Sequence, residues 1–149
     1  MRVEAREAAY VEFVTARQTH LRRVAYALCG DWDRADELLH TALTKLYAAW
    51  PRVQRDGTEE AYVRRIIVRS NVDRHQPETR EHPRPGHSPL FEALRALPPM
   101  QRKALVLEHW LGLSVEEVAE DLGISTRRAA ICSSGALAAL QGVLTQEDT

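Results

Sequence analysis

The chain has 149 residues, enough for one ordinary domain or two small ones. Its hydrophobic fraction of 44% can form packed cores, which excludes a wholly disordered protein. The 20 basic residues nearly balance the 21 acidic ones, so any attraction to nucleic acid has to be local. The acidic N-terminus does not resemble a signal peptide, and no stretch reaches the roughly 18 apolar residues of a membrane span. We therefore expect a cytoplasmic protein.

Apolar residues recur at helical spacing through the first half of the chain. One stripe, from Tyr10 to Leu28, predicts a helix that ends at Gly30. A second stripe, from Ala35 to Trp50, predicts the next helix. Its start can be capped by either of two residues, Asp31 or Asp33.

Proline sets the expected limits of the next segments. Pro51 is predicted to end the second helix, because a proline lacks the N–H that an interior helical residue donates. A polar loop over Arg52–Gly57 should follow, after which Thr58 can cap a third helix that ends near His75–Pro77. Residues 77–89 are rich in proline and charge and predict a flexible linker between domains at 8–76 and 90–144.

The second half of the chain predicts shorter helices. Leu90–Leu97 should form one that stops at Pro98, and a second should run from about Met100 to Trp110 before Gly112. No strand alternation is found, so the sequence predicts an all-α protein made of two small helical domains. Cysteines 29 and 132 form no CxxC pair and are expected to be reduced and buried.

A helix-turn-helix is the strongest local pattern. Ser114 and Glu117 have the spacing of a capping box, and Gly123 can adopt the left-handed turn that ends the first helix. Ala119 is small where the second helix would cross it. Apolar residues in the same register should pin the two helices together: Val118, Leu122, Ile124, Ala129 and Cys132. Either Ser125 or Thr126 can cap the last helix, which should reach about Leu140; a plain helical hairpin is the alternative.

Two clusters of arginine point to nucleic acid. Arg127 and Arg128 occupy the first turn of the last helix, where the helix dipole disfavours cations unless phosphates or base edges approach. Between residues 61 and 75, four arginines stand against Asp73 alone, a local charge of +3. Two solvated arginines without a partner are the alternative for Arg127 and Arg128.

Three segments resemble the extracytoplasmic-function sigma factors of the sigma-70 family, in the group common in high-GC actinobacteria. Phe13–Val53 and Glu59–His75 resemble the helices of sigma region 2, and Ala93–Ser125 (ALRALPPMQRKALVLEHWLGLSVEEVAEDLGIS) resembles region 4. The resemblance implies a protein that guides RNA polymerase to promoters, opens the −10 element and reads the −35 element. It implies no cofactor and no catalysis.

The resemblance also implies a set of partners and contact residues. The polar start of the second helix would dock on the clamp helices of the largest polymerase subunit through Asp33, Asp36, Glu37 and His40. The −10 strand would be captured by Arg52, Arg55, Tyr62, Arg64, Arg65, Arg69, Asn71 and Arg74. The −35 duplex would be contacted by Ser125, Thr126, Arg127 and Arg128. The flap of the second-largest subunit and an anti-sigma factor are further expected partners.

Other interpretations remain open from the residues. Tyr62 also lies on the apolar stripe, where packing in the core competes with stacking on a base. Ala130 and Gly135 stand where the resembling group has basic residues, which motivates a degenerate sigma-like protein that binds polymerase or a regulator without reading −35 DNA. A repressor using the same helix-turn-helix is a third hypothesis. An enzyme is not expected, because the six histidines are scattered and no metal-ligand spacing or phosphate-binding loop is found.

Overall fold

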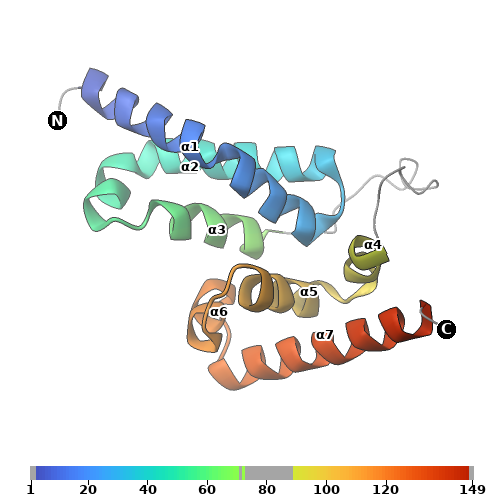
Figure 1. Cartoon of the computed structure of the whole chain (residues 1–149). Coiled ribbons are helices and arrows are strands. Elements are labelled where there is room, and N and C mark those ends of the chain that lie inside the picture. The colour runs from blue at the N-terminus through green and yellow to red at the C-terminus, as the bar shows by residue number, and fades with distance from the viewer. Residues whose placement is uncertain (1–2, 71, 73–88, 148–149) are drawn as a thin grey trace.

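The computed structural model describes residues 3–70, 72 and 89–147, and the regular elements among them are all helical. This confirms the all-α prediction. In Figure 1 one layer consists of α1 (Val3–Cys29), α2 (Trp32–Asp56) and α3 (Glu59–Arg69). Facing it lie α4 (Pro89–Ala96), α5 (Pro99–Leu105), the π-helical turn η2 (Val106–Trp110), α6 (Val115–Leu122) and α7 (Thr126–Glu147). Within this part of the chain, none of the helices has the length and apolar character needed to cross a membrane. The predicted linker lies outside the described residues except for Pro89, which begins α4.

The turn between α1 and α2 follows its predicted signals. Gly30 has a φ of 72°, in the left-handed region that glycine adopts without strain, and its N–H donates to the carbonyl of Tyr26. Of the two candidate caps of α2, Asp31 is the one used, because its carboxylate accepts the N–H of Asp33 at 2.9 Å. The first helical hairpin is thus set by local sequence.

The prediction that Pro51 ends the second helix is wrong. Helix α2 continues to Asp56 and ends at Gly57, which has a φ of 69°. An interior proline costs about 3 kcal/mol, but Val53, one turn beyond Trp50, is buried, and burial of such a side chain returns about 1.5–3 kcal/mol. The Pro51 ring itself faces solvent. Tertiary packing therefore extends the helix over the expected loop.

The predicted cap and end of α3 are also corrected. The Thr58 side chain makes no capping hydrogen bond, because its backbone (φ −114°, ψ 26°) is not in the extended conformation that presents a cap oxygen. The helix ends at Arg69 rather than near residues 75–77. There the Ser70 hydroxyl donates to the carbonyl of Ile66 at 2.6 Å, and its backbone turns to an extended ψ of 164°.

The helix-turn-helix has the predicted caps. Ser114 and Glu117 form both hydrogen bonds of the capping box, at 3.1 and 3.0 Å, and Gly123 has a φ of 72°. Ser125 caps α7 by accepting the N–H of Arg128. Helix α7 continues past the predicted end at residue 140, since no proline follows to stop it.

A single apolar core joins the two layers. Leu21 and Val24 of α1 and Ile67 of α3 belong to the same buried cluster as Leu107 of η2 and Val118 of α6. A smaller cluster lies between α4, α5 and α7. Cys29 is buried, as predicted, whereas Cys132 is only half-buried, and the two form no disulfide with each other. The two halves of the chain are therefore packed against each other.

Candidate nucleic-acid interface

The side chains predicted to dock on polymerase share one face of α2. Their spacing of three, four and seven residues places them on the same side of the helix, and all are exposed: Asp33, Asp36, Glu37 and His40. Asp36 accepts from Arg22 of α1 at 2.6 Å, and this hydrogen bond raises the pKa of Arg22 above its usual value. Glu37 accepts from the nearly buried Arg34 at 2.6 Å. The face is acidic, and two of its carboxylates are fixed by arginines.

Three of the predicted −10 residues surround the junction of α2 and α3. Arg52 and Arg55 are exposed on the last turns of α2, where a loop was expected. Tyr62 is half-buried, packs against the main core and directs its hydroxyl to the carbonyl of Lys45 at 3.5 Å. Asn71 and Arg74 lie outside the described residues.

The other three predicted −10 residues converge on α6. The carboxylate of Asp121, which has no exposed surface, accepts hydrogen bonds from Nε of Arg64 and, at 2.9 Å, from Nε of Arg65. Arg65 also lies 3.3 Å from the carboxylate of Glu120. Because a charged acceptor favours the charged donor, the hydrogen bond that Arg65 donates to Asp121 raises the pKa of Arg65.

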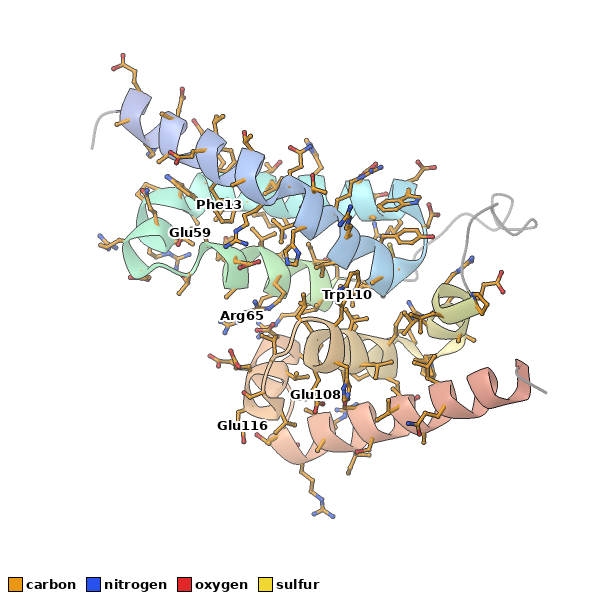
Figure 2. All side chains as sticks on the ribbon, in the orientation of Figure 1. Phe13, Glu59, Arg65, Glu108, Trp110 and Glu116 are labelled. Atoms are coloured by element: carbon orange, nitrogen blue, oxygen red, sulfur yellow. The ribbon has the colours of Figure 1, made fainter. Side chains whose placement is uncertain are left out.

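Arg69 binds α6 differently, through backbone atoms. Its Nε donates to the carbonyl of Asp121 at 2.8 Å, and its Nη2 donates to the carbonyl of Glu120 at 2.7 Å. These carbonyls lie at the negative end of the α6 dipole, where a cation is favoured. Figure 2 shows the Arg65 side chain between α3 and α6. We call these residues the Asp121 cluster: Arg64, Arg65, Arg69, Glu120 and Asp121.

A groove of about 480 Å³ runs along α3 beside this cluster. It is lined by one lysine, two arginines, the Tyr62 ring, two small hydroxyl residues and one isoleucine: Lys45, Arg65, Arg69, Tyr62, Thr58, Ser70 and Ile66. Guanidinium groups can bind phosphates and stack on bases, and a tyrosine ring can stack too. The groove therefore has the chemistry of a site for a single nucleic-acid strand.

The predicted −35 residues stand at the start of α7, and all are exposed: Ser125, Thr126, Arg127 and Arg128. In the next turn of the same helix Ile131 is 62% exposed, with the exposed Ala130 beside it, and the exposed residues beyond carry no charge up to Gly142. The exposed face of α7 that would contact DNA therefore has basic residues only in the first turn of the helix.

Sequence reasoning missed the role of Asp121 and of the buried Arg102. The available signal for Asp121 was its spacing, because an acid three residues after Val118 falls on the buried side of α6. Arg102 is 2% exposed and bonds backbone carbonyls of α1 and α4. No sequence signal marks it. Within the described ranges no three histidine, cysteine or acidic side chains gather as metal ligands, and His82 and His87 lie outside those ranges.

Two packed layers of helices, the second with a helix-turn-helix, fit the architecture of a sigma factor. The family model for sigma-70 region 2 matches residues 13–81, and the model for sigma-70 region 4 matches residues 88–130. The chain belongs to the sigma-70 family of RNA polymerase sigma factors. It therefore functions in transcription as a DNA-binding, promoter-directing sigma factor, and this result favours the sigma hypothesis over the degenerate interaction protein.

Individual relatives agree with the family. The chain is 31% identical to the RNA polymerase sigma-E factor of Streptomyces coelicolor, over 93% of this chain and 88% of the relative. It is 29% identical to the sigma-E factor of Streptomyces antibioticus, with coverage of 93% and 86%. Among solved structures it resembles the sigma factor RpoE of Bartonella quintana, determined in complex with the anti-sigma factor NepR. That match has a TM-score of 0.72 and 21% identity, and covers 92% of this chain and 97% of the other.

Proposed function

We propose that the chain divides its work between residues 8–76, which bind core polymerase and the −10 strand, and residues 90–144, which bind the −35 duplex, with 77–89 as the linker. The observation that supports this most is the cationic face of α3 beside the 480 Å³ groove. The chain would act in the cytoplasm and catalyse no reaction itself, since polymerase contacts and captured bases supply the free energy of opening.

In this proposal the −10 strand lies along α3. Arg65 and Arg69 are four residues apart, so their guanidinium groups lie on one side of the helix and can bind successive phosphates. Tyr62 lines the same groove and is half-buried, so the accessible part of its side chain can meet a base while the rest packs on the core. Arg52 and Arg55 would extend the cationic track along the end of α2, and Asn71 and Arg74 would extend it beyond α3.

The test is in vitro transcription with purified core enzyme, on promoters located by a chromatin map of the tagged protein. Arg65→Ala and Arg69→Ala should each lower open-complex formation by about tenfold, because each removes a charge-assisted phosphate contact. Arg23→Ala, which changes an exposed arginine of α1 outside the groove, should stay within about twofold of wild type. Full transcription by the two α3 variants would contradict the proposal.

Core binding is proposed for the acidic face of α2. Asp33→Asn is the most informative change, because Asp33 is exposed and its side chain has no ion pair among the described residues. It should weaken capture of the largest polymerase subunit, whose clamp helices are the proposed partner. Glu12→Gln, an exposed change on α1, should not. If both variants captured the largest polymerase subunit equally well, Asp33 would not be part of the interface.

The −35 contact is proposed for the first turn of α7, whose arginines and positive helix-dipole end can attract phosphates and base edges. Arg127→Ala and Arg128→Ala should each lower transcription from promoters that carry a −35 element while leaving capture of core polymerase intact. Normal transcription by both variants would contradict the proposal that this turn contacts the −35 element. The flap of the second-largest subunit is proposed as the partner of this block. An anti-sigma partner is supported by the complex in which the similar RpoE was solved.

A further inference from the structure

The most exposed large apolar side chain in the described part of the chain belongs to helix α7. Ile131 is 62% exposed, whereas the other large apolar residues at the surface of this part are between 38% and 57% exposed. A β-branched residue is also a weaker helix former than alanine, so Ile131 adds little to the stability of the fold. Folding therefore gives no reason for an isoleucine at this position.

Ile131 lies on the side of α7 that faces away from the rest of the protein. The helix packs against α4, α5 and α6, with Ala129, Ser133 and Ala136 on its buried side. Successive residues of an α-helix are turned by about 100°, so a residue two positions after Ala129 points away from that side. Figure 1 shows α7 on the side of the second layer that is farthest from α1, α2 and α3. Ile131 is thus presented to a partner outside the chain.

The same side of α7 begins with an arginine proposed to contact the −35 duplex. Arg127 lies one helical turn before Ile131, and both are exposed on the same face. Their exposed neighbours Ala130 and Ser134 have short side chains, which leave room for a base edge to approach Ile131. The major groove of DNA admits an α-helix, whose outward face then reaches the base edges. Ile131 therefore continues the face that Arg127 would direct to the bases.

An apolar side chain in the major groove is suited to one base. Of the four bases, only thymine presents a methyl group there, and the others present hydrogen-bonding atoms. An isoleucine side chain has no donor or acceptor with which to bind those polar edges. Its χ1 angle has one strongly preferred value in a helix, so little rotational freedom is lost when the side chain meets a methyl group. The chemistry of Ile131 favours a thymine.

A protein partner fits this position less well than a base. Protein docking surfaces are contiguous apolar patches, and the largest patch on a typical monomer covers about 300–600 Å². Ile131 instead stands between polar residues on its face of α7, with Arg127 one turn before it and Ser134 about one turn after it. A single methyl group matches a single apolar side chain in size.

We propose that Ile131 is a specificity-determining residue that contacts the methyl group of a thymine in the −35 element. This inference rests on the proposed −35 contact of α7. Isoleucine binds no phosphate, so the contact adds discrimination between bases without adding affinity for DNA of any sequence. It lets α7 distinguish promoters although the only basic residues of this helix are Arg127 and Arg128.

The test removes the methyl group from the DNA and its contact from the protein. Synthetic duplexes carry a promoter found in the chromatin map, and each thymine of the −35 region is replaced in turn by deoxyuridine, which lacks only the methyl group. Transcription by polymerase that holds the full chain should fall about fourfold at one thymine or two adjacent ones, the effect of one buried methyl group. With Ile131→Ala, which keeps a good helix former at an exposed position, the deoxyuridine effect there should shrink below about 1.5-fold.

Val11→Ala is the matched control. Val11 is also β-branched and is 57% exposed, but it lies on α1 outside the proposed interfaces, so this variant should keep the full deoxyuridine effect. A second measurement restores the methyl group on another base. Cytosine and 5-methylcytosine are compared at the responsive thymine, and the methylated base should raise transcription about twofold or more with wild type but not with Ile131→Ala.

The outcomes separate this inference from the −35 contact on which it rests. Loss of the deoxyuridine effect in Ile131→Ala, but not in Val11→Ala, supports the inference. If no thymine responds while Arg127→Ala still lowers transcription, the inference is overturned and the −35 contact of α7 stands. A deoxyuridine effect that persists in Ile131→Ala, or an Ile131→Ala loss that is equal on both kinds of duplex, also overturns it. If the deoxyuridine, Arg127→Ala and Ile131→Ala changes are all without effect, the −35 contact fails and the inference with it.

Discussion

Arg102→Met tests how the two layers are held together, because Arg102 joins them from a buried position. Its side chain lies on α5, is 2% exposed and donates to the carbonyl of Leu28 at the end of α1, at 2.6 Å. It also donates to three carbonyls at the end of α4, those of Leu94, Arg95 and Leu97, at 2.9, 3.4 and 3.0 Å. The carbonyls in the last turns of helices lack partners within the helix, so one guanidinium caps two helices.

The expected loss of stability follows from these contacts. A hydrogen bond to a charged group contributes about 1.5–3 kcal/mol, and a buried carbonyl left without a donor costs about 1–3 kcal/mol. Methionine keeps the apolar stem, and water can reach some carbonyls when the helix ends loosen. We therefore expect Arg102→Met to lower the free energy of unfolding by about 3–5 kcal/mol, a large part of the 5–15 kcal/mol typical of a domain.

Urea unfolding followed by circular dichroism at 222 nm and by tryptophan fluorescence measures this loss. Arg52→Met is the matched control, because Arg52 is exposed at the end of α2 and its replacement should change stability by less than about 0.5 kcal/mol. A loss below about 1 kcal/mol for Arg102→Met, or a loss equal to that of the control, would refute the view that Arg102 fastens the layers.

Local features of the helix-turn-helix give further expectations. Ser114→Ala should cost about 1 kcal/mol in urea unfolding, because it removes the N-cap of α6. The backbone N–H of Ser114 lowers the pKa of Glu117, so this carboxylate stabilises the fold above its unfolded pKa, and the effect is lost as pH falls through the lower folded pKa. The stability difference between wild type and Glu117→Gln should accordingly shrink as pH falls below the range in which an ordinary glutamate titrates, and a difference that does not change with pH would contradict this. Gly135→Ala should stabilise α7 by about 0.5–1 kcal/mol if the Gln101 amide, 3.3 Å from the new Cβ, moves aside. Gly142→Ala, with open space around it, is the control; thermal unfolding that shows a loss only at residue 135 would mean that the amide cannot move.

Local sequence predicted those helix limits that local interactions determine. The capping box at Ser114, the left-handed glycines Gly30 and Gly123, and the cap at Asp31 depend on residues within one turn of each other. Pro51 was misjudged because the decisive interaction is the burial of Val53 in the core, which no local pattern reveals. Tertiary contacts outweighed helix propensity there.

The candidate site was predictable in its basic part and not in its acidic part. The excess of arginine on α3 is a property of one segment, so composition alone could indicate it. The pairing of Arg64 with Asp121 joins residues 57 positions apart and depends on how the two layers dock. The only sequence signal for this pairing was an acidic residue on the buried side of α6, and that signal could not show which arginine the acid would pair with.

The contact between α3 and α6 also explains why the composition looks unlike that of a DNA-binding protein. The net charge of −1 combines a basic helix α3 with the four acids of α6, and arginines of α3 pair with two of these acids in the folded chain. Since acids on α6 repel phosphates, they should also weaken reading of the −35 element by the neighbouring start of α7. A promoter engaged through α3 with a strong −10 element is therefore the kind that this sigma factor should favour.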